Sequence, residues 1–386
     1  HVTAEMGVQL PFRSDVTFEE VQFAAIARMD DLNVRDLFGD YDVSDGQMRL
    51  TLDENNMEVT GEIAIEGMPA EVRWKENFSP EAPFQSRYDI SAVLDASARE
   101  TFGIGLGPFA SGPFEMNFTY TVSSDGQQHV TAVLDGENDS MEIPELFWQK
   151  PVGESATVFF MARLEDNKNV EVSNFELNSK DLRVKGSAEI DPQHGNLISA
   201  ELSSVQLGDN DVTVAYKHDY DGNIVLNVGG KSLDLRPYIK QLRDADQGNL
   251  PPFILEANVE RLITRADQQI TDARARAVNS AERLESAVLI GTLISDSELR
   301  LILEPDGAKR RLVVRSNDAG SVARAFNIYD DVIGGSLVLD ATLHDDLPGA
   351  PVEGEVQIED YKVINAPILA QILTIASFTG IFDALQ

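Results

Sequence analysis

The chain has 386 residues, of which 42% are hydrophobic, a content that allows a large buried surface and excludes a disordered chain. Its 65 acidic residues outnumber 31 basic ones and give a net charge of −34, which excludes a nucleic-acid partner because that affinity depends on clustered Lys and Arg. The chain has no cysteine, so disulfides, thiolate metal sites and cysteine nucleophiles are excluded as well.

The dominant pattern along the chain is an alternation of apolar and polar residues. It occurs in the segments 59–65, 182–190, 212–216, 224–228 and 337–343. Because successive side chains of a strand point to opposite faces, each segment predicts a half-buried strand. Turn sequences separate many of the segments: Asp125-Gly126, Pro192-Gln193-His194-Gly195, Asp221-Gly222 and Asp306-Gly307. The pattern predicts antiparallel hairpins with one apolar and one polar face.

Few helices are predicted, and they are short. They cover 33–38, 97–103, 236–244, 320–326 and the terminal run from Ile368. The stretch 268–284 is ambiguous, because it contains good helix formers but no strong apolar stripe. Its flanks, 253–263 and 284–293, resemble strands, so we interpret it as strand, turn and strand, with the turn near Asn279-Ser280.

The chain contains no Pro-rich or Gly/Ser-rich linker, which favours one continuous architecture. We expect a β-groove segment over 1–363 and, over 364–386, a C-terminal apolar helix that packs on the sheet or caps it. The apolar run 367–385 carries several polar residues, which favours this helix over a membrane span. The chain begins with His1 and ends close to this run, so we expect it to be a fragment of a longer protein.

A seven-residue pattern, Val-x-Gly-x-apolar-x-Ile, occurs at 59–65, 184–190 and 352–358. The unequal spacing excludes a solenoid of fixed period, and the pattern is compatible either with a weak internal repeat or with coincidence in a β-rich chain. Its glycines, Gly61, Gly186 and Gly354, either leave room on the apolar face or mark bends and bulges.

No arrangement of residues in the sequence indicates catalysis. The five histidines are scattered, no Gly-x-Ser-x-Gly motif or phosphate-binding loop occurs, and the acidic pairs lie in turns or on predicted polar faces. We therefore predict no catalytic residue, no cofactor and no metal site. Trp74 and Trp148 are expected to pack on the sheet, with ligand stacking as the alternative.

Several blocks of the chain resemble the AsmA-like family, most closely its large YhdP-type members from Gram-negative bacteria. They are IEGMPAEVRWKENF, IPELFWQKPVGESA, SNDAGSVARAFNIYDDVIGGSLVLDA and, from Asp360, DYKVINAPILAQILTIASFTGIFDALQ. The blocks follow the family's order and span residues 67–386.

The resemblance implies an elongated, twisted and curved antiparallel β-sheet with an open apolar groove. It also implies a periplasmic location, an inner-membrane anchor outside this segment, and a role in moving phospholipids towards the outer membrane. We therefore expect a non-enzymatic, bridge-like lipid-transfer module whose partner is a phospholipid or another acyl lipid. The groove candidates are the inward residues of the repeats: Val59, Ile63, Ile65, Val184, Ala188, Ile190, Val356 and Ile358.

Two other functions are compatible with the sequence. One is an assembly or scaffolding factor that binds outer-membrane proteins by pairing with their strand edges. The other is a degradative enzyme on a β scaffold, which would require convergent carboxylates or histidines in one cleft.

Overall fold

The computed structural model describes residues 1–14, 17, 21–38, 41–104, 109–165, 168–193, 195–219, 222–239, 252–280, 283–347 and 350–364. The described residues are mainly strand, and 21 strands belong to one open sheet in which antiparallel pairs dominate. This confirms the predicted fold class. The chain divides into two compact units, His1–Ile198 and Ser199–Gln386, and each is described by itself.

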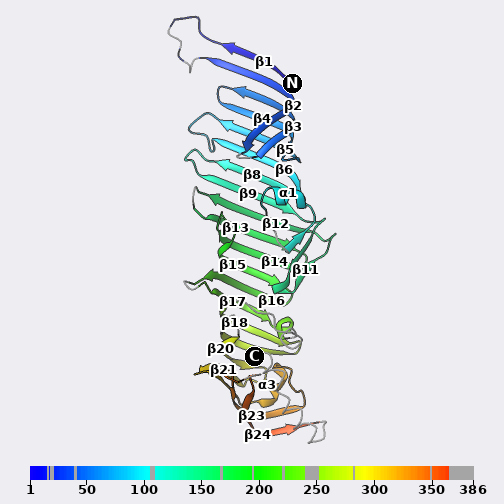
Figure 1. The fold of residues 1–386 in the computed structure, drawn as a ribbon, viewed down its shortest axis with the longest axis vertical. Coiled ribbons are helices and arrows are strands. Elements are labelled where there is room, and N and C mark those ends of the chain that lie inside the picture. Colours follow the sequence, from blue (N-terminus) through cyan, green and yellow to red (C-terminus); the bar gives the residue numbers. More distant parts are fainter. Residues whose placement is uncertain are drawn as a thin grey trace. The chain divides into compact units, whose positions relative to one another are not determined.

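In the first unit, each strand pairs with the next in an antiparallel series (Figure 1). The series is β1 (Val2–Gln9), β2 (Gln22–Phe38), β3 (Tyr41–Asp53), β4 (Asn56–Ile65), β5 (Met68–Asn77), β6 (Ser86–Leu94), β8 (Phe114–Val122), β9 (Gln128–Asp135), β12 (Ala156–Leu164), β13 (Val170–Ser179) and β14 (Leu182–Ile190). The predicted turn at Asp125-Gly126 joins β8 to β9, where Gly126 has a φ of 83° that glycine adopts without strain.

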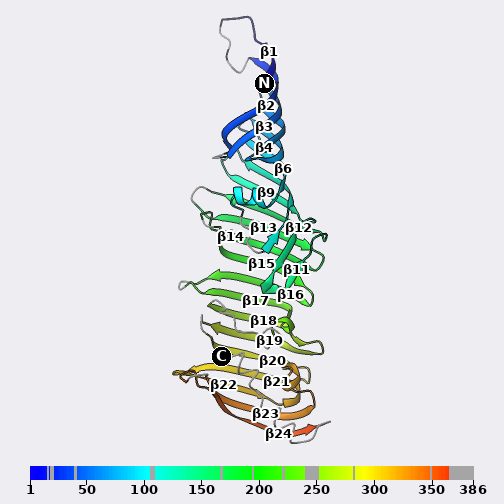
Figure 2. The same cartoon turned by 45° about the vertical axis from the view of Figure 1, so that its right-hand side comes forward.

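A small module accompanies these strands. It contains α1 (Ala96–Thr101), the 3-10 turn η3 (Pro144–Leu146) and a separate three-stranded sheet of β7 (Ala110–Ser111), β10 (Ser140–Ile143) and β11 (Trp148–Lys150). In Figures 1 and 2, β11 runs outside the main series.

The buried ammonium group of Lys150 holds the loops of this module together. It donates to the carbonyl oxygens of Gly136, Asp139 and Glu154 at 2.6–2.9 Å and lies 3.1 Å from Oδ1 of Asp139. Trp148, on the same strand, is also buried. The segment Trp148-Gln149-Lys150-Pro151, part of the block IPELFWQKPVGESA, therefore has a structural role here.

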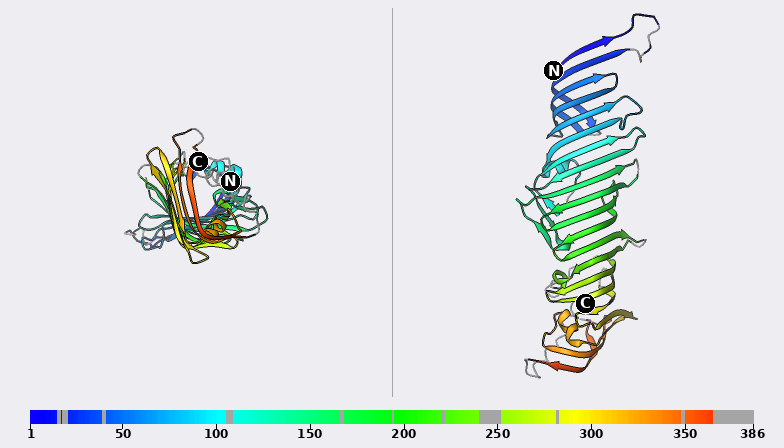
Figure 3. Two further views of the ribbon diagram at one scale, coloured as in Figure 1. Left: turned by 90° about the horizontal axis from the view of Figure 1, so that it is seen from below. Right: turned by 180° about the vertical axis from the view of Figure 1, so that it is seen from behind.

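The second unit contains the strands β16 (Asn210–His218), β17 (Ile224–Asp234), β18 (Phe253–Arg265), β19 (Gln268–Asn279), β20 (Leu284–Leu293), β21 (Glu298–Asp306), β22 (Lys309–Ser316), β23 (Val332–Leu343) and β24 (Val352–Val363). Most of β15 (Leu197–Leu207) and the helix α3 (Ala319–Ala325) also belong to it. Neighbouring strands pair in chain order, as the view from behind shows (Figure 3).

One pair departs from the predicted hairpins, because β17 and β18 run parallel. Parallel neighbours need a crossover connection of a dozen or more residues, and the stretch of sequence between the two strands, 235–252, is long enough for one. Residues 236–239 are helical, as predicted, and most of the predicted helix 236–244 lies outside the described residues.

Most of the other local predictions on described residues are confirmed. The ambiguous stretch 268–284 forms strand, turn and strand, and α1 and α3 match the predicted helices. The helix predicted at 33–38 is wrong, because this segment ends β2 and pairs with β3 through Val34 and Val43. Strand pairing outweighs local helix preference there. The predicted helix from Ile368 lies outside the described residues.

Gly61 marks a close approach between strands and not free space. A Cβ atom at this position would lie 2.0 Å from the carbonyl oxygen of Gln47, where the β3–β4 register shifts. Gly354 is similarly crowded, because its Cβ would lie 2.5 Å from that of Ala341.

We therefore predict that Gly61→Ala destabilises the protein by about 1–3 kcal/mol, because the strands must separate to admit a methyl group. Urea unfolding should show a lower midpoint. Gly7→Ala is the matched control, since a Cβ there meets no atom within 4 Å. Equal midpoints for the two variants would contradict this packing.

Candidate functional site

One face of the sheet in the first unit is lined with apolar side chains. Direct cross-strand partners lie on the same face, and one register row reads Val59, Trp74, Tyr88, Tyr120, Val130, Ala162, Val172, Ala188 from β4 to β14. A neighbouring row on the other face reads Thr60, Arg73, Asp89, Thr119, Thr131, Met161. We call the first surface the apolar face and the second the polar face.

The apolar face forms a cluster from a single layer of strands. Val130, Ala162 and Val172 are buried, and half-buried side chains surround them, among them Phe118, Tyr120, Phe160 and Phe175. All members of this cluster come from neighbouring strands, β8 to β14. The side chains cover one another laterally, and the half-buried aromatic rings keep part of their surface accessible.

A second cluster of the apolar face lies over β3 to β5. Val59, Ile63 and Ile65 are each 5% exposed there, and Phe102, directly after α1, packs against the cluster. The rings of Phe102 and Tyr41 meet edge to face at 5.1 Å. The apolar face is therefore closed by packing near α1 and more accessible over the later strands of the unit.

The second unit has an apolar face of its own. Its central row reads Leu202, Val214, Val228, Ala257, Ala275, Leu289, Leu301, Val314, Leu339, Val356 from β15 to β24. The helix α3 contacts β19, β20, β23 and β24, and Val322 on it is buried. Leu262, Ile270, Leu293 and Leu299 are at most 4% exposed.

The groove candidates from the sequence occupy different environments. Val59, Ile63 and Ile65 lie in the cluster near α1, and Val184 is buried on β14. Ala188 and Ile190 are half-buried at the edge of the other cluster. The structure therefore brings the first-unit candidates onto one apolar face, with Val184 outside the two clusters.

The remaining candidates, Val356 and Ile358, belong to the second unit and lie on β24. Val356 is 37% exposed and Ile358 is half-buried.

The residues predicted from the sequence do not include the aromatic residues of the apolar face. The alternation of Phe114, Met116, Phe118 and Tyr120 in β8 would have found several of them.

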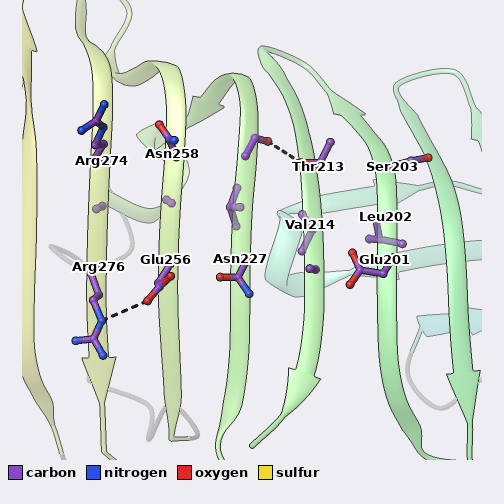
Figure 4. A pocket seen from close by; sticks show the side chains of 15 residues that line it. Glu201, Leu202, Ser203, Thr213, Val214, Asn227, Glu256, Asn258, Arg274 and Arg276 are labelled. Atoms are coloured by element: carbon purple, nitrogen blue, oxygen red, sulfur yellow. Dashed lines mark hydrogen bonds and ion pairs between the residues drawn. The ribbon is translucent and has the colours of Figure 1, made fainter.

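A surface hollow of about 610 Å³ lies on the polar face of the second unit (Figure 4). Five neighbouring strands, β15 to β19, each line the hollow with three consecutive residues. The side chain of the middle residue belongs to the apolar face, and those of the two flanking residues belong to the polar face. The flanking residues include Ser203, Thr213, Asn227, Asn258 and Arg274. Arg276 pairs with Glu256 at 3.5 Å. The open, mixed-charge lining presents no convergent catalytic group.

The described residues contain no group of three side chains arranged to hold a metal ion. Within the same part of the chain, no helix combines the length and the apolar character needed to cross a membrane.

The fold and these surfaces define the class of protein, an open and mainly antiparallel β-sheet protein with one apolar face in each unit. Comparison with protein-family models, curated proteins and solved structures finds no match to this chain. The resemblance to the AsmA-like family therefore stays a prediction.

Proposed function

We propose that this chain is a non-enzymatic lipid-transfer module whose apolar face shields the acyl chains of phospholipids. The observation that carries the proposal is the uninterrupted apolar row across neighbouring strands in each unit. The half-buried aromatic side chains of this face support it, because they provide apolar surface beyond what the sheet buries for itself.

The energetics explain why such a face would be needed. Each methylene group of an acyl chain costs about 0.8 kcal/mol when it enters water, so a lipid cannot leave a bilayer freely. Strands lie about 4.8 Å apart, and the eight-residue row of the first unit therefore spans roughly 34 Å. One leaflet supplies about half of a ~30 Å bilayer core, so this row is long enough to cover an extended chain.

The proposed setting is the periplasm of a Gram-negative bacterium, between the inner and outer membranes. The sequence blocks that resemble AsmA-like proteins support this location, and the absence of cysteine suits an oxidising compartment. The proposed anchor to the inner membrane would lie outside this segment.

We expect gently purified protein to carry phospholipid. Native mass spectrometry should show mass increments of whole lipids, and thin-layer chromatography of the extract should identify them. Delipidated protein should take lipid up again from vesicles, and the charged substitution Ile190→Glu, on the more accessible part of the apolar face, should lower that uptake. A lipid-free protein that takes up no lipid from vesicles would overturn the proposal.

A second function, strand-edge binding of unfolded outer-membrane proteins, is favoured by a different observation. Strand β1 is exposed along its whole length, with Met6 69% exposed and Val8 51% exposed, and β2 lies beside it (Figure 1). An extended peptide adds to such an edge through main-chain hydrogen bonds. Cross-links from β1 to a peptide, in the absence of bound lipid, would favour this function over lipid transfer.

A further inference from the structure

Glu76 is the only charged side chain on the apolar face in the described strands from β3 to β14. Its register partners on this face are Met57 and Ser86. It is half-buried and lies one residue before the end of β5, beside the connection to β6. The same row continues through Val122 and Gln128, so this carboxylate is a single charge among apolar and neutral polar side chains.

Neutral donors orient this carboxylate. The indole Nε1 of Trp74 donates to Oε1 of Glu76 at 2.5 Å, and the hydroxyl of Ser86 donates to Oε2 at 2.7 Å. No lysine, arginine or histidine among the described residues lies within ion-pair distance of Glu76. The hydroxyl of Tyr88 is a third neutral donor to this carboxylate, so these contacts hold the group in place without a positive charge beside it.

The carboxylate stands at one end of a ladder of aromatic rings. Trp74 and Tyr88 stack at 5.5 Å with an interplanar angle of 16°, and Tyr88 lies 6.0 Å from Tyr120. Burial, together with the Glu76 carboxylate, raises the pKa of Tyr88 to about 12, so the ring stays neutral. Neutral aromatic faces attract cations and give no such attraction to anions.

We propose that Glu76, Trp74, Tyr88 and Tyr120 bind the ammonium group of an amine-bearing lipid headgroup. This inference rests on the proposed lipid-transfer function and adds the headgroup class to it. The ammonium group supplies the cation that Glu76 lacks and forms a charge-assisted hydrogen bond with it. A headgroup that carries only a phosphate charge is repelled by the carboxylate, and a glycerol headgroup gains neither contact.

The test loads delipidated protein from vesicles of equimolar phosphatidylethanolamine and phosphatidylglycerol with identical acyl chains. Native mass spectrometry then gives the ratio of the two bound lipids. We expect wild-type protein to favour phosphatidylethanolamine roughly five- to tenfold. Glu76→Gln should bring the ratio close to one by lowering the amount of bound phosphatidylethanolamine, while bound phosphatidylglycerol does not fall, because the amide keeps the size of the side chain and loses its charge.

Glu71→Gln is the matched control, since Glu71 is exposed on the polar face of the same strand. Its cross-strand register partner on β4 is Glu62. It should keep the wild-type ratio. Equal uptake of both lipids by wild-type protein, or an unchanged preference in Glu76→Gln, would overturn the headgroup assignment and leave lipid transfer intact. Uptake of neither lipid would overturn the proposed function itself.

A titration with glycerophosphoethanolamine separates the lipid from the free headgroup. It carries the same ammonium group without acyl chains, so we expect weak competition that disappears in Glu76→Gln. Tight binding of this compound by a protein that takes up no lipid would assign Glu76 to a soluble amine and overturn the lipid assignment.

Discussion

Phe160→Asp is expected to lower the amount of phospholipid bound to the protein by an order of magnitude or more. Phe160 lies in the middle of β12 on the apolar face, where its register partners are Ala132 and Phe175. A carboxylate there must either lose its hydration or keep acyl chains away, and an uncompensated charge in apolar surroundings costs several kcal/mol. Each 1.4 kcal/mol corresponds to a factor of ten in binding.

The neighbouring residue provides a matched control. Phe159 is half-buried like Phe160, but it lies on the polar face, with Val133 and Glu176 as partners. Phe159→Asp removes the same aromatic surface from the same strand and should leave lipid uptake near the wild-type level. Circular dichroism should show that both variants keep the strand content of the parent.

The comparison separates the two proposed functions. If strand-edge pairing at β1 were the activity, neither Phe159 nor Phe160 would affect ligand binding, because both lie on β12. Equal lipid uptake by the two variants would show that the apolar face does not hold the acyl chains.

The strands of this chain can be predicted from its sequence because the alternation of apolar and polar residues is a property of each short segment. Alternation in 59–65 and 182–190 predicted one apolar and one polar face, and the registers of β4 and β14 show both. The apolar residues of 268–284 form no helical stripe, and this pattern predicts the observed strand, turn and strand against the helix propensity of the stretch.

Features that depend on distant parts of the chain could not be predicted in this way. The parallel pairing of β17 with β18 results from a crossover, and the strand at 33–38 depends on pairing with β3. The role of Lys150 becomes clear only when three loop carbonyls converge on it.

The candidate site was predictable as a face and not as a set of residues. The repeats identified Ile63 and Val184, which are largely covered by their neighbours. The half-buried aromatic residues and Glu76 acquire their significance from cross-strand register, which places Trp74 beside Tyr88 and Tyr88 beside Tyr120. Register is a property of strand pairs, and a single strand segment does not reveal it.

The second large effect is expected at a buried ion pair in the second unit. The Arg310 side chain is 1% exposed and that of Asp345 is 4% exposed, and two N–H groups of Arg310 donate to the carboxylate at 2.8 Å each. A third N–H group donates to the carbonyl oxygen of Leu284. The hydrogen bond from Arg310 lowers the pKa of Asp345.

We predict that Arg310→Met destabilises the protein by about 3–5 kcal/mol at neutral pH, because it leaves Asp345 buried with only Arg283 nearby, at 3.3 Å. Arg311→Met is the matched control. Arg311 also pairs with an aspartate, Asp340, but both side chains are more than 40% exposed, so its loss should cost less than about 1 kcal/mol. Urea unfolding of both variants at pH 7 measures the difference.

The pH dependence gives this prediction a second, independent readout. An aspartate whose pKa is lowered on folding stabilises the folded state above its unfolded pKa, about 3.9, and that contribution is lost as the pH falls through the folded value. Without Arg310, protonation of Asp345 relieves the uncompensated charge. The gap in stability between wild-type protein and Arg310→Met should therefore narrow as the pH is lowered from 7 towards 3. A gap that stays constant over this range would mean that Arg310 stabilises the strands by packing alone and not through the charge of Asp345.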